Sequence, residues 1–247
     1  MQQLYHHDEI IHNSDAARQV LPILFDVYKP SSILDVGCGL GNWIEVSKKL
    51  GVLKVVGIDG HYIDHTLLKI EESEFIEKDL STSFNLNQKF DLVFCLEVAE
   101  HLPSSSAENL IQSLVNHADV IMFSAAIPGQ GGQRHINEQW PKYWQTKFEK
   151  YGFEMIDFFR PKIWDNNKIE RWYRQNLFLV VKKEHSLSRL GNNLGLSLVH
   201  PELLEIVTAQ YEERIKNLQS TIQKLQSRDI IGKLAQVFRK KNKKKHV

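Results

Sequence analysis

The strongest constraint on the fold is a glycine-rich turn that joins a short apolar run to an amphipathic one, at residues 33–43 (ILDVGCGLGNW). This order is typical of a strand, a tight turn and the start of a helix. Glycines in such a turn let backbone N–H groups approach a ligand closely. The segment therefore predicts an α/β fold with a ligand at the end of its first strand.

Further apolar runs bounded by turn residues are separated by stretches long enough for a helix, which is the pattern of a parallel sheet with crossover helices. The runs expected to be parallel strands are 32–36, 54–58, 74–76, 90–95 and 120–124. Two more runs, 153–159 and 176–182, have no good helix between them and predict an antiparallel hairpin with a long loop. The predicted fold class is α/β, with a seven-strand, doubly wound, mostly parallel sheet.

Helices are expected between these strands. The predicted segments run from Ser14 or Asp15 to before Pro30, and over 41–50, 62–72, 106–117 and 138–150. Residues 1–183 thus form one predicted catalytic domain, and the Ser-, Asn- and Gly-rich stretch that follows predicts a linker at 184–200.

The C-terminal part of the chain predicts a helical appendage at 201–238 and a basic tail at 239–247. Apolar residues in the helix alternate at spacings of four and three, namely Tyr211, Ile215, Leu218, Ile222 and Leu225. The spacing fits a coiled-coil seam, through which the chain would pair with itself or with an assembly partner. It fits equally well a lone amphipathic helix that folds back on the domain. The tail either contacts an anionic membrane surface or is a solvated end.

Composition limits the class of protein and of partner. The 247 residues are 42% hydrophobic and 25% charged, as in soluble globular proteins. The formal charge is +1, and the basic tail contributes six positive charges, which leaves −5 for the rest. This balance argues against a nucleic-acid partner. No signal peptide or membrane-spanning run is evident, and Cys38 and Cys95 are expected to be reduced thiols. These features predict a cytoplasmic protein. If the basic tail binds a membrane, the protein is expected to be peripheral to its inner face.

Asp35 identifies the ligand of the glycine turn. A dinucleotide fold requires G-x-G-x-x-G, but here the third glycine comes one position early and Asn42 stands in its place. The Asp35 carboxylate, two residues before the first glycine, would repel a pyrophosphate and attract an amino group or a sulfonium. The sequence therefore favours a cationic adenosyl ligand over a dinucleotide.

Two more acids follow the next two strands. Asp59 is placed to accept both ribose hydroxyls, and Asp79 to accept from the adenine amino group beside the Leu80 backbone. The residues expected to contact the ligand are Asp35, Gly37, Cys38, Gly39, Asn42, Trp43, Asp59, Gly60, Asp79, Leu80, Leu96 and Glu97.

With this loop, these acids and the strand at 90–93, residues 10–182 resemble the class I S-adenosylmethionine-dependent methyltransferases. The resemblance implies a Rossmann-like fold and S-adenosylmethionine as cofactor. It also implies that Cys38 is a small core residue and not a nucleophile.

Acceptor chemistry is expected at the carboxyl ends of the fourth and fifth strands. Glu97, Glu100 and His101 are spaced to converge on one helical turn, where two carboxylates need a cation or a proton between them. The run is similar to one in small-RNA 2′-O-methyltransferases and ubiquinone-pathway O-methyltransferases, in which it holds a divalent metal. The resemblance implies a Mg-like ion on Glu97, Glu100, His101 and His135.

The alternative, which we favour, needs no metal. His135, in the glycine-rich stretch after the fifth strand, then acts as the general base, with His101 as the second choice. Proton removal by one positioned histidine suffices, because a sulfonium leaves readily.

The block at 125–140 resembles methyltransferases of bacterial surface-polysaccharide assembly. The expected activity is therefore O-methylation of a hydroxyl on a surface-polysaccharide sugar or its activated precursor. The alternatives are a phosphate-bearing small metabolite, an RNA end, or a cofactor-binding module recruited to a glycan assembly complex. Aromatic and polar side chains that could wall the acceptor site are Trp140, Tyr143, Trp144, Trp164, Arg171, Trp172, Tyr173 and Asn176.

Overall fold

A computed structural model describes residues 13–191 and 197–243, without the side chains of 227–231 and 234–243. The chain divides into two compact units, Met1–His200 and Pro201–Val247. Each is described by itself.

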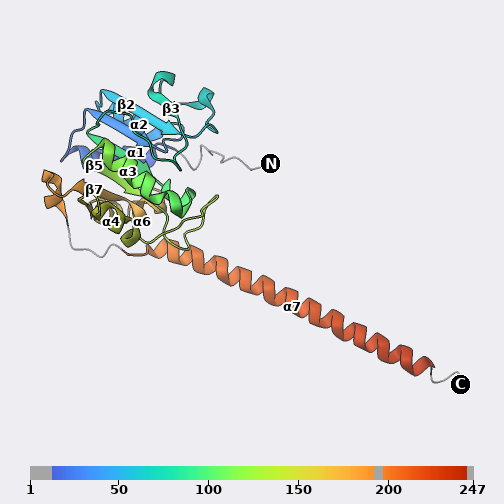
Figure 1. The fold of residues 1–247 in the computed structure, drawn as a ribbon. Helices are drawn as coiled ribbons and strands as arrows, with labels where there is room; N and C mark the ends of the chain where they lie inside the picture. The colour runs from blue at the N-terminus through green and yellow to red at the C-terminus, as the bar shows by residue number, and fades with distance from the viewer. Residues whose placement is uncertain (1–12, 192–196, 244–247) are drawn as a thin grey trace. The chain divides into compact units, whose positions relative to one another are not determined.

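The first unit is built on one seven-stranded sheet, as predicted (Figure 1). Its strands are β1 Ser32–Val36, β2 Lys54–Asp59, β3 Phe75–Glu77, β4 Leu92–Leu96, β5 Val120–Ser124, β6 Phe153–Ile156 and β7 Phe178–Lys182. They lie in the order β3-β2-β1-β4-β5-β7-β6, and β7 runs antiparallel to both of its neighbours while all other pairs are parallel. The order reverses between β1 and β4, where open α/β sheets bind ligands.

Helices cover both faces of the sheet. On one face, α1 Asp15–Phe25 and α2 Asn42–Lys49 pack in a cluster with Ile33 of β1. On the other, α3 Ala107–His117 and α4 Pro141–Glu149 pack in a second cluster with Leu34, the next residue of the same strand. Because strand side chains alternate between faces, one apolar run fills both layers.

Two expectations about local structure were wrong. Residues 62–72 form no α-helix but two 3₁₀ turns, His65–Leu67 and Glu72–Glu74. The Asp64 side chain accepts a hydrogen bond from the Thr66 backbone N–H, a local bond that competes with helix formation. The hairpin of β6 and β7 is confirmed, but its connection contains α5 Arg160–Ile163 and α6 Arg171–Asn176, where no helix was expected.

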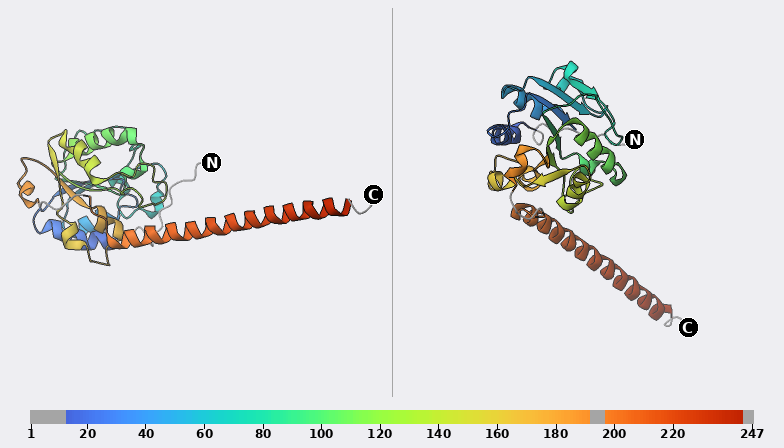
Figure 2. Two further views of the ribbon diagram at one scale, coloured as in Figure 1. Left: turned by 90° about the horizontal axis from the view of Figure 1, so that it is seen from below. Right: turned by 60° about the vertical axis from the view of Figure 1, so that its left-hand side comes forward.

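The segment predicted as a linker contributes a 3₁₀ helix, Ser186–Leu190, to the first unit. In the second unit, α7 runs from Pro201 to Lys243 as one continuous helix (Figure 2). The five apolar residues of the predicted seam are each between 52% and 58% exposed. The basic tail at 239–247 lies outside the residues whose side chains are described. Among the described residues, none of the helices combines the length and the apolar character needed to cross a membrane.

Candidate functional site

A cavity of about 1250 Å³ opens at the carboxyl ends of β1, β2 and β4. It is bordered by the β1–α2 turn, the ends of the strands, the loop after β5 and the start of α6. Every site residue expected from the sequence borders it: Asp35, Gly37, Cys38, Gly39, Asn42, Trp43, Asp59, Gly60, Asp79, Leu80, Leu96, Glu97, Glu100, His101 and His135.

The glycine turn adopts a backbone that few other residues could follow. Gly37 has φ +82°, and a Cβ atom added there would lie 2.2 Å from Cγ2 of Val98. The N–H groups of Gly37 and Cys38 donate to the Ile58 carbonyl, which ties the turn to the end of β2. The glycine requirement is therefore as much a matter of packing against Val98, two residues beyond the end of β4, as of ligand approach.

Asp35 is 3% exposed, and its Oδ2 has no hydrogen-bond donor in the described part of the chain. Burial, and secondly the negative charge of Asp59, raise the pKa of Asp35 well above its ordinary value. A buried, unsatisfied carboxylate oxygen on a cavity wall fits a positively charged hydrogen-bond donor such as an amino group.

Asp59 is more heavily engaged than the sequence suggests. Its carboxylate accepts from the N–H groups of Gly39 and Gly60, each at 2.7 Å, and from the Tyr62 hydroxyl. A carboxylate offers about four lone-pair positions. For both ribose hydroxyls to bind Asp59, Tyr62 must therefore release its hydrogen bond.

Asp79 lies exposed at the cavity edge, and its Oδ1 accepts from the Ser81 N–H at 2.8 Å. The hydrogen bonds from Ser81 lower the pKa of Asp79, which favours its ionised, hydrogen-bond-accepting form. Cys38 is 7% exposed, and burial, with Asp35 and Asp59 nearby, raises the pKa of its thiol. It therefore lacks the character of a nucleophile.

Glu97 does not join the other acids on a helical turn, and this corrects the expected geometry. Only Ala99–His101 forms a 3₁₀ turn, and Glu97 precedes it with φ +54°. Its carboxylate accepts from the side-chain amides of Gln130 and Asn176, each at 3.2 Å. Burial raises the pKa of Glu97, and these amide hydrogen bonds oppose the rise.

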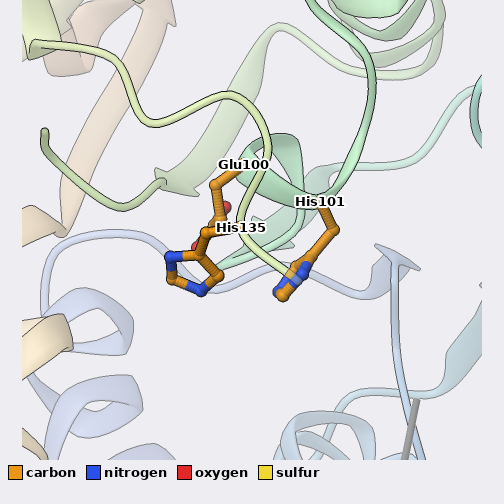
Figure 3. A group of neighbouring side chains, drawn as sticks. All are labelled: Glu100, His101 and His135. Atoms are coloured by element: carbon orange, nitrogen blue, oxygen red, sulfur yellow. The ribbon is translucent and has the colours of Figure 1, made fainter. Parts of the chain in front are cut away.

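Glu100, His101 and His135 do converge (Figure 3). One potential ligand atom from each lies within 4.8 Å of the others. Both carboxylate oxygens of Glu100 are buried without a hydrogen-bond partner among the described residues, and burial with the nearby charge of Glu97 raises its pKa. The two imidazole rings meet edge to face, with centroids 4.9 Å apart. Three of the four expected metal ligands therefore form a group, and Glu97 lies outside it.

His135 has a carboxylate partner that the sequence reading missed. Its Nδ1 lies 2.9 Å from Oε1 of Glu138, and the two side chains are 12% and 19% exposed. Glu138 stands three residues after His135, and that spacing was the available signal. The pair gives the site an imidazole oriented by an acid, the arrangement of a general base.

Comparison with known proteins bears on the family and the fold of the chain. A family model described as "Methyltransferase domain" matches residues 11–200. A curated relative, the ubiquinone biosynthesis O-methyltransferase of Pasteurella multocida (strain Pm70), is 33% identical over 109 residues, which cover 37% of this chain and 45% of the relative. The match thus spans less than half of that relative's length.

Two solved structures share the fold. The sugar N-methyltransferase KedS8 from Streptoalloteichus sp ATCC 53650 superposes with a TM-score of 0.55 at 14% identity, covering 74% of this chain and 98% of its own. DesVI of Streptomyces venezuelae gives 0.51 at 14% identity, covering 72% and 99%. At such identities the likeness is one of fold.

Proposed function

The chain belongs to the methyltransferase-domain family, and we propose that it is an S-adenosylmethionine-dependent O-methyltransferase acting on a sugar hydroxyl of a surface polysaccharide or its activated precursor. One observation carries the proposal. A buried acid with an unsatisfied oxygen, Asp35, and an oriented imidazole, His135, border the same cavity.

The residues fit the methyl donor. Asp35 takes its amino group, Asp59 its ribose and Asp79 its adenine, while the glycine turn lets the backbone approach. When bound, S-adenosylmethionine supplies a methyl group attached to a sulfonium, and the sulfur is a good leaving group. His135 accepts the proton of the attacking hydroxyl, while the new carbon–oxygen bond forms and the carbon–sulfur bond breaks.

Arginine and tryptophan side chains support a sugar acceptor that carries phosphate. Arg171 and Trp172 border the cavity, and the Arg171 guanidinium lies 5.6 Å from the Trp172 ring centroid. Nε of Arg171 is buried without an acceptor among the described residues. Aromatic faces suit sugar rings, and arginine suits phosphate oxygens. Of the other suggested wall residues, Trp144 is instead a core residue, 1% exposed.

A panel of acceptors tests the proposal. The full chain would be incubated with methyl-labelled S-adenosylmethionine and a nucleotide-activated sugar, a free monosaccharide, glycerol phosphate or a short RNA. We expect labelled methyl ether on the activated sugar, read by mass spectrometry. Transfer only to glycerol phosphate or RNA, or cofactor binding without transfer to any acceptor, would overturn the substrate assignment.

A metal-assisted reaction is the second candidate, because Glu100, His101 and His135 form a ligand-like group. Two imidazoles and one carboxylate suit a transition metal such as Mn or Co better than Mg, which prefers oxygen. These residues would hold the ion, which would lower the pKa of a bound hydroxyl.

Chelation separates the two candidates. We expect methyl transfer to persist in excess EDTA, because an oriented His135 suffices as base. The rate would be compared before chelation, after it, and after Mg, Mn or Co is added back. Loss of activity in EDTA with recovery on one of these ions would establish the metal and displace the general base.

We further propose that α7 pairs in parallel with α7 of a second copy of the chain. Ile215 and Ile222 occupy a positions of its heptads, with Tyr211, Leu218 and Leu225 at d. All five are more than half exposed. Isoleucine at a with leucine at d favours parallel two-stranded coiled coils.

The double variant Leu218→Asp, Ile222→Asp is expected to convert a dimer to a monomer, because it puts charges into the seam. Sedimentation equilibrium of the full chain measures this, with Gln223→Asp, which adds a charge beside the seam, as the matched control. A wild-type chain that stays monomeric at the highest concentration would contradict the pairing.

A further inference from the structure

Glu138 closes the loop between β5 and α4 on itself. Its Oε2 accepts from the Gly129 N–H at 2.7 Å, and its Oε1 accepts from the Gly131 N–H at 2.8 Å. Both glycines have positive φ, +87° and +68°. The same Oε1 lies 2.9 Å from Nδ1 of His135. One carboxylate thus holds both the loop backbone and the imidazole that the loop carries.

These contacts show that both oxygens of the Glu138 carboxyl group act as hydrogen-bond acceptors. Two backbone N–H groups already donate to it, so it is held as an acceptor on both oxygens. Its contact with His135 is then a hydrogen bond in which the imidazole donates. Nδ1 must carry the hydrogen, and in the neutral ring Nε2 is left with the lone pair.

The absence of a side chain at Gly132 leaves room for the imidazole ring of His135. A Cβ atom added at Gly132 would lie 2.3 Å from Nε2, so any side chain there would collide with it. The loop is also fixed on its other side, because the N–H groups of Ile136 and Asn137 donate to the Glu100 carbonyl at 2.9 and 3.0 Å. His135 therefore lies between two anchored points of the loop.

The other carboxylates near His135 cannot substitute for Glu138. Glu97 is occupied by the amides of Gln130 and Asn176. Both carboxylate oxygens of Glu100 are buried, and neither has a hydrogen-bond partner among the described residues.

We propose that Glu138 is a positioning residue, which fixes His135 as the Nδ1–H tautomer and aims Nε2 at the acceptor hydroxyl. The inference rests on the proposed role of His135 as general base. It adds that the base consists of His135 together with Glu138, and that the Glu138 carboxylate holds both the imidazole and the backbone of the glycine loop. Glu138 is not among the residues that border the cavity.

The variant Glu138→Gln is the direct test. The amide can accept at only one end, so in either orientation one glycine N–H loses its acceptor. With the NH₂ group at the Oε1 position, the amide also donates to Nδ1, which moves the ring hydrogen to Nε2. We expect the single-turnover rate to fall by roughly 10²–10⁴-fold, as when a catalytic histidine loses its orienting acid. Adenosylhomocysteine affinity by calorimetry is expected to stay within about twofold, because Glu138 is outside the cofactor contacts. Glu149→Gln, an exposed glutamate at the end of α4, is the matched control.

A spectroscopic readout separates positioning from structure. Two-bond ¹H–¹⁵N spectra of the full chain, with His135 assigned through a His135→Asn variant, report which ring nitrogen carries hydrogen. We expect hydrogen on Nδ1 in the wild type and its partial transfer to Nε2 in Glu138→Gln. Hydrogen on Nε2 in the wild type would overturn the proposal even if the variant failed to fold.

The outcomes also distinguish this inference from the proposed function. Wild-type transfer that Glu138→Gln leaves unchanged in rate and tautomer refutes the positioning role alone. The expected tautomer in a protein that methylates no acceptor refutes the function and leaves the Glu138 contact standing.

Discussion

Replacing Asp35 with asparagine is expected to weaken adenosylhomocysteine and S-adenosylmethionine binding by about 10²-fold, because removing one partner of a buried charge pair costs roughly 2–5 kcal/mol. The same change is expected to stabilise the ligand-free domain. Asp35 is 3% exposed with an unsatisfied oxygen, so its ionised form is costly until the cation arrives. Opposite changes in binding and stability would mark a residue that serves the ligand and not the fold.

The pH dependence follows from the raised pKa of Asp35. The unfolded carboxyl loses its proton near its ordinary pKa, whereas the folded ligand-free protein keeps it to higher pH. The folded state then binds more protons, so the free energy of unfolding falls as pH rises from the ordinary value through the raised one. In the Asp35→Asn variant, the decrease in the free energy of unfolding that Asp35 causes as pH rises should be absent.

Urea unfolding at about pH 5 and about pH 8, with calorimetry for binding, measures both effects. Asp119→Asn, an exposed acid 3.9 Å from Lys182, is the control. Equal cofactor affinity in Asp35→Asn and wild type would refute the role of Asp35, and a loss of stability together with binding would make it structural.

The variant His135→Ala is expected to lower the rate of methyl transfer by roughly 10²–10⁴-fold with cofactor affinity unchanged, because a positioned general base contributes about that much. His101→Ala should have the smaller effect. Both histidines border the cavity, and Nδ1 of His135 lies 2.9 Å from Oε1 of Glu138, which favours His135 as the base.

Single-turnover assays on the acceptor found by the panel, with isothermal calorimetry for adenosylhomocysteine, separate chemistry from binding. His65→Ala, a partly exposed histidine paired with Glu72 away from the acceptor side, is the control. A His135→Ala rate within about threefold of the wild type would place the base elsewhere.

The fold, and the meeting of three acids at one cavity, could be predicted because both follow from local patterns. Apolar runs predict strands, and the carboxyl ends of parallel strands meet at one edge of the sheet. Asp35, Asp59 and Asp79 therefore border one cavity, although they are far apart in sequence.

The acceptor half depends on contacts that no local pattern encodes. Glu97 is held by Gln130 and Asn176, which lie 33 and 79 positions away. The spacing of Glu97, Glu100 and His101 predicted one helical turn, but Glu97 has a left-handed backbone and precedes the 3₁₀ turn that Glu100 and His101 share. Such a backbone is uncommon outside glycine, asparagine and aspartate, so a sequence reading had no reason to expect it.

The place of β7 in the sheet has a consequence for how the protein is made. Because β7 lies between β5 and β6, neither strand has its full set of neighbours until Lys182 has left the ribosome. A nascent chain that stops before Phe178 would leave β5, which is buried along its whole length in the finished sheet, as an apolar edge open to other chains. Synthesis of the first unit thus passes through an aggregation-prone stage that only its final strand ends.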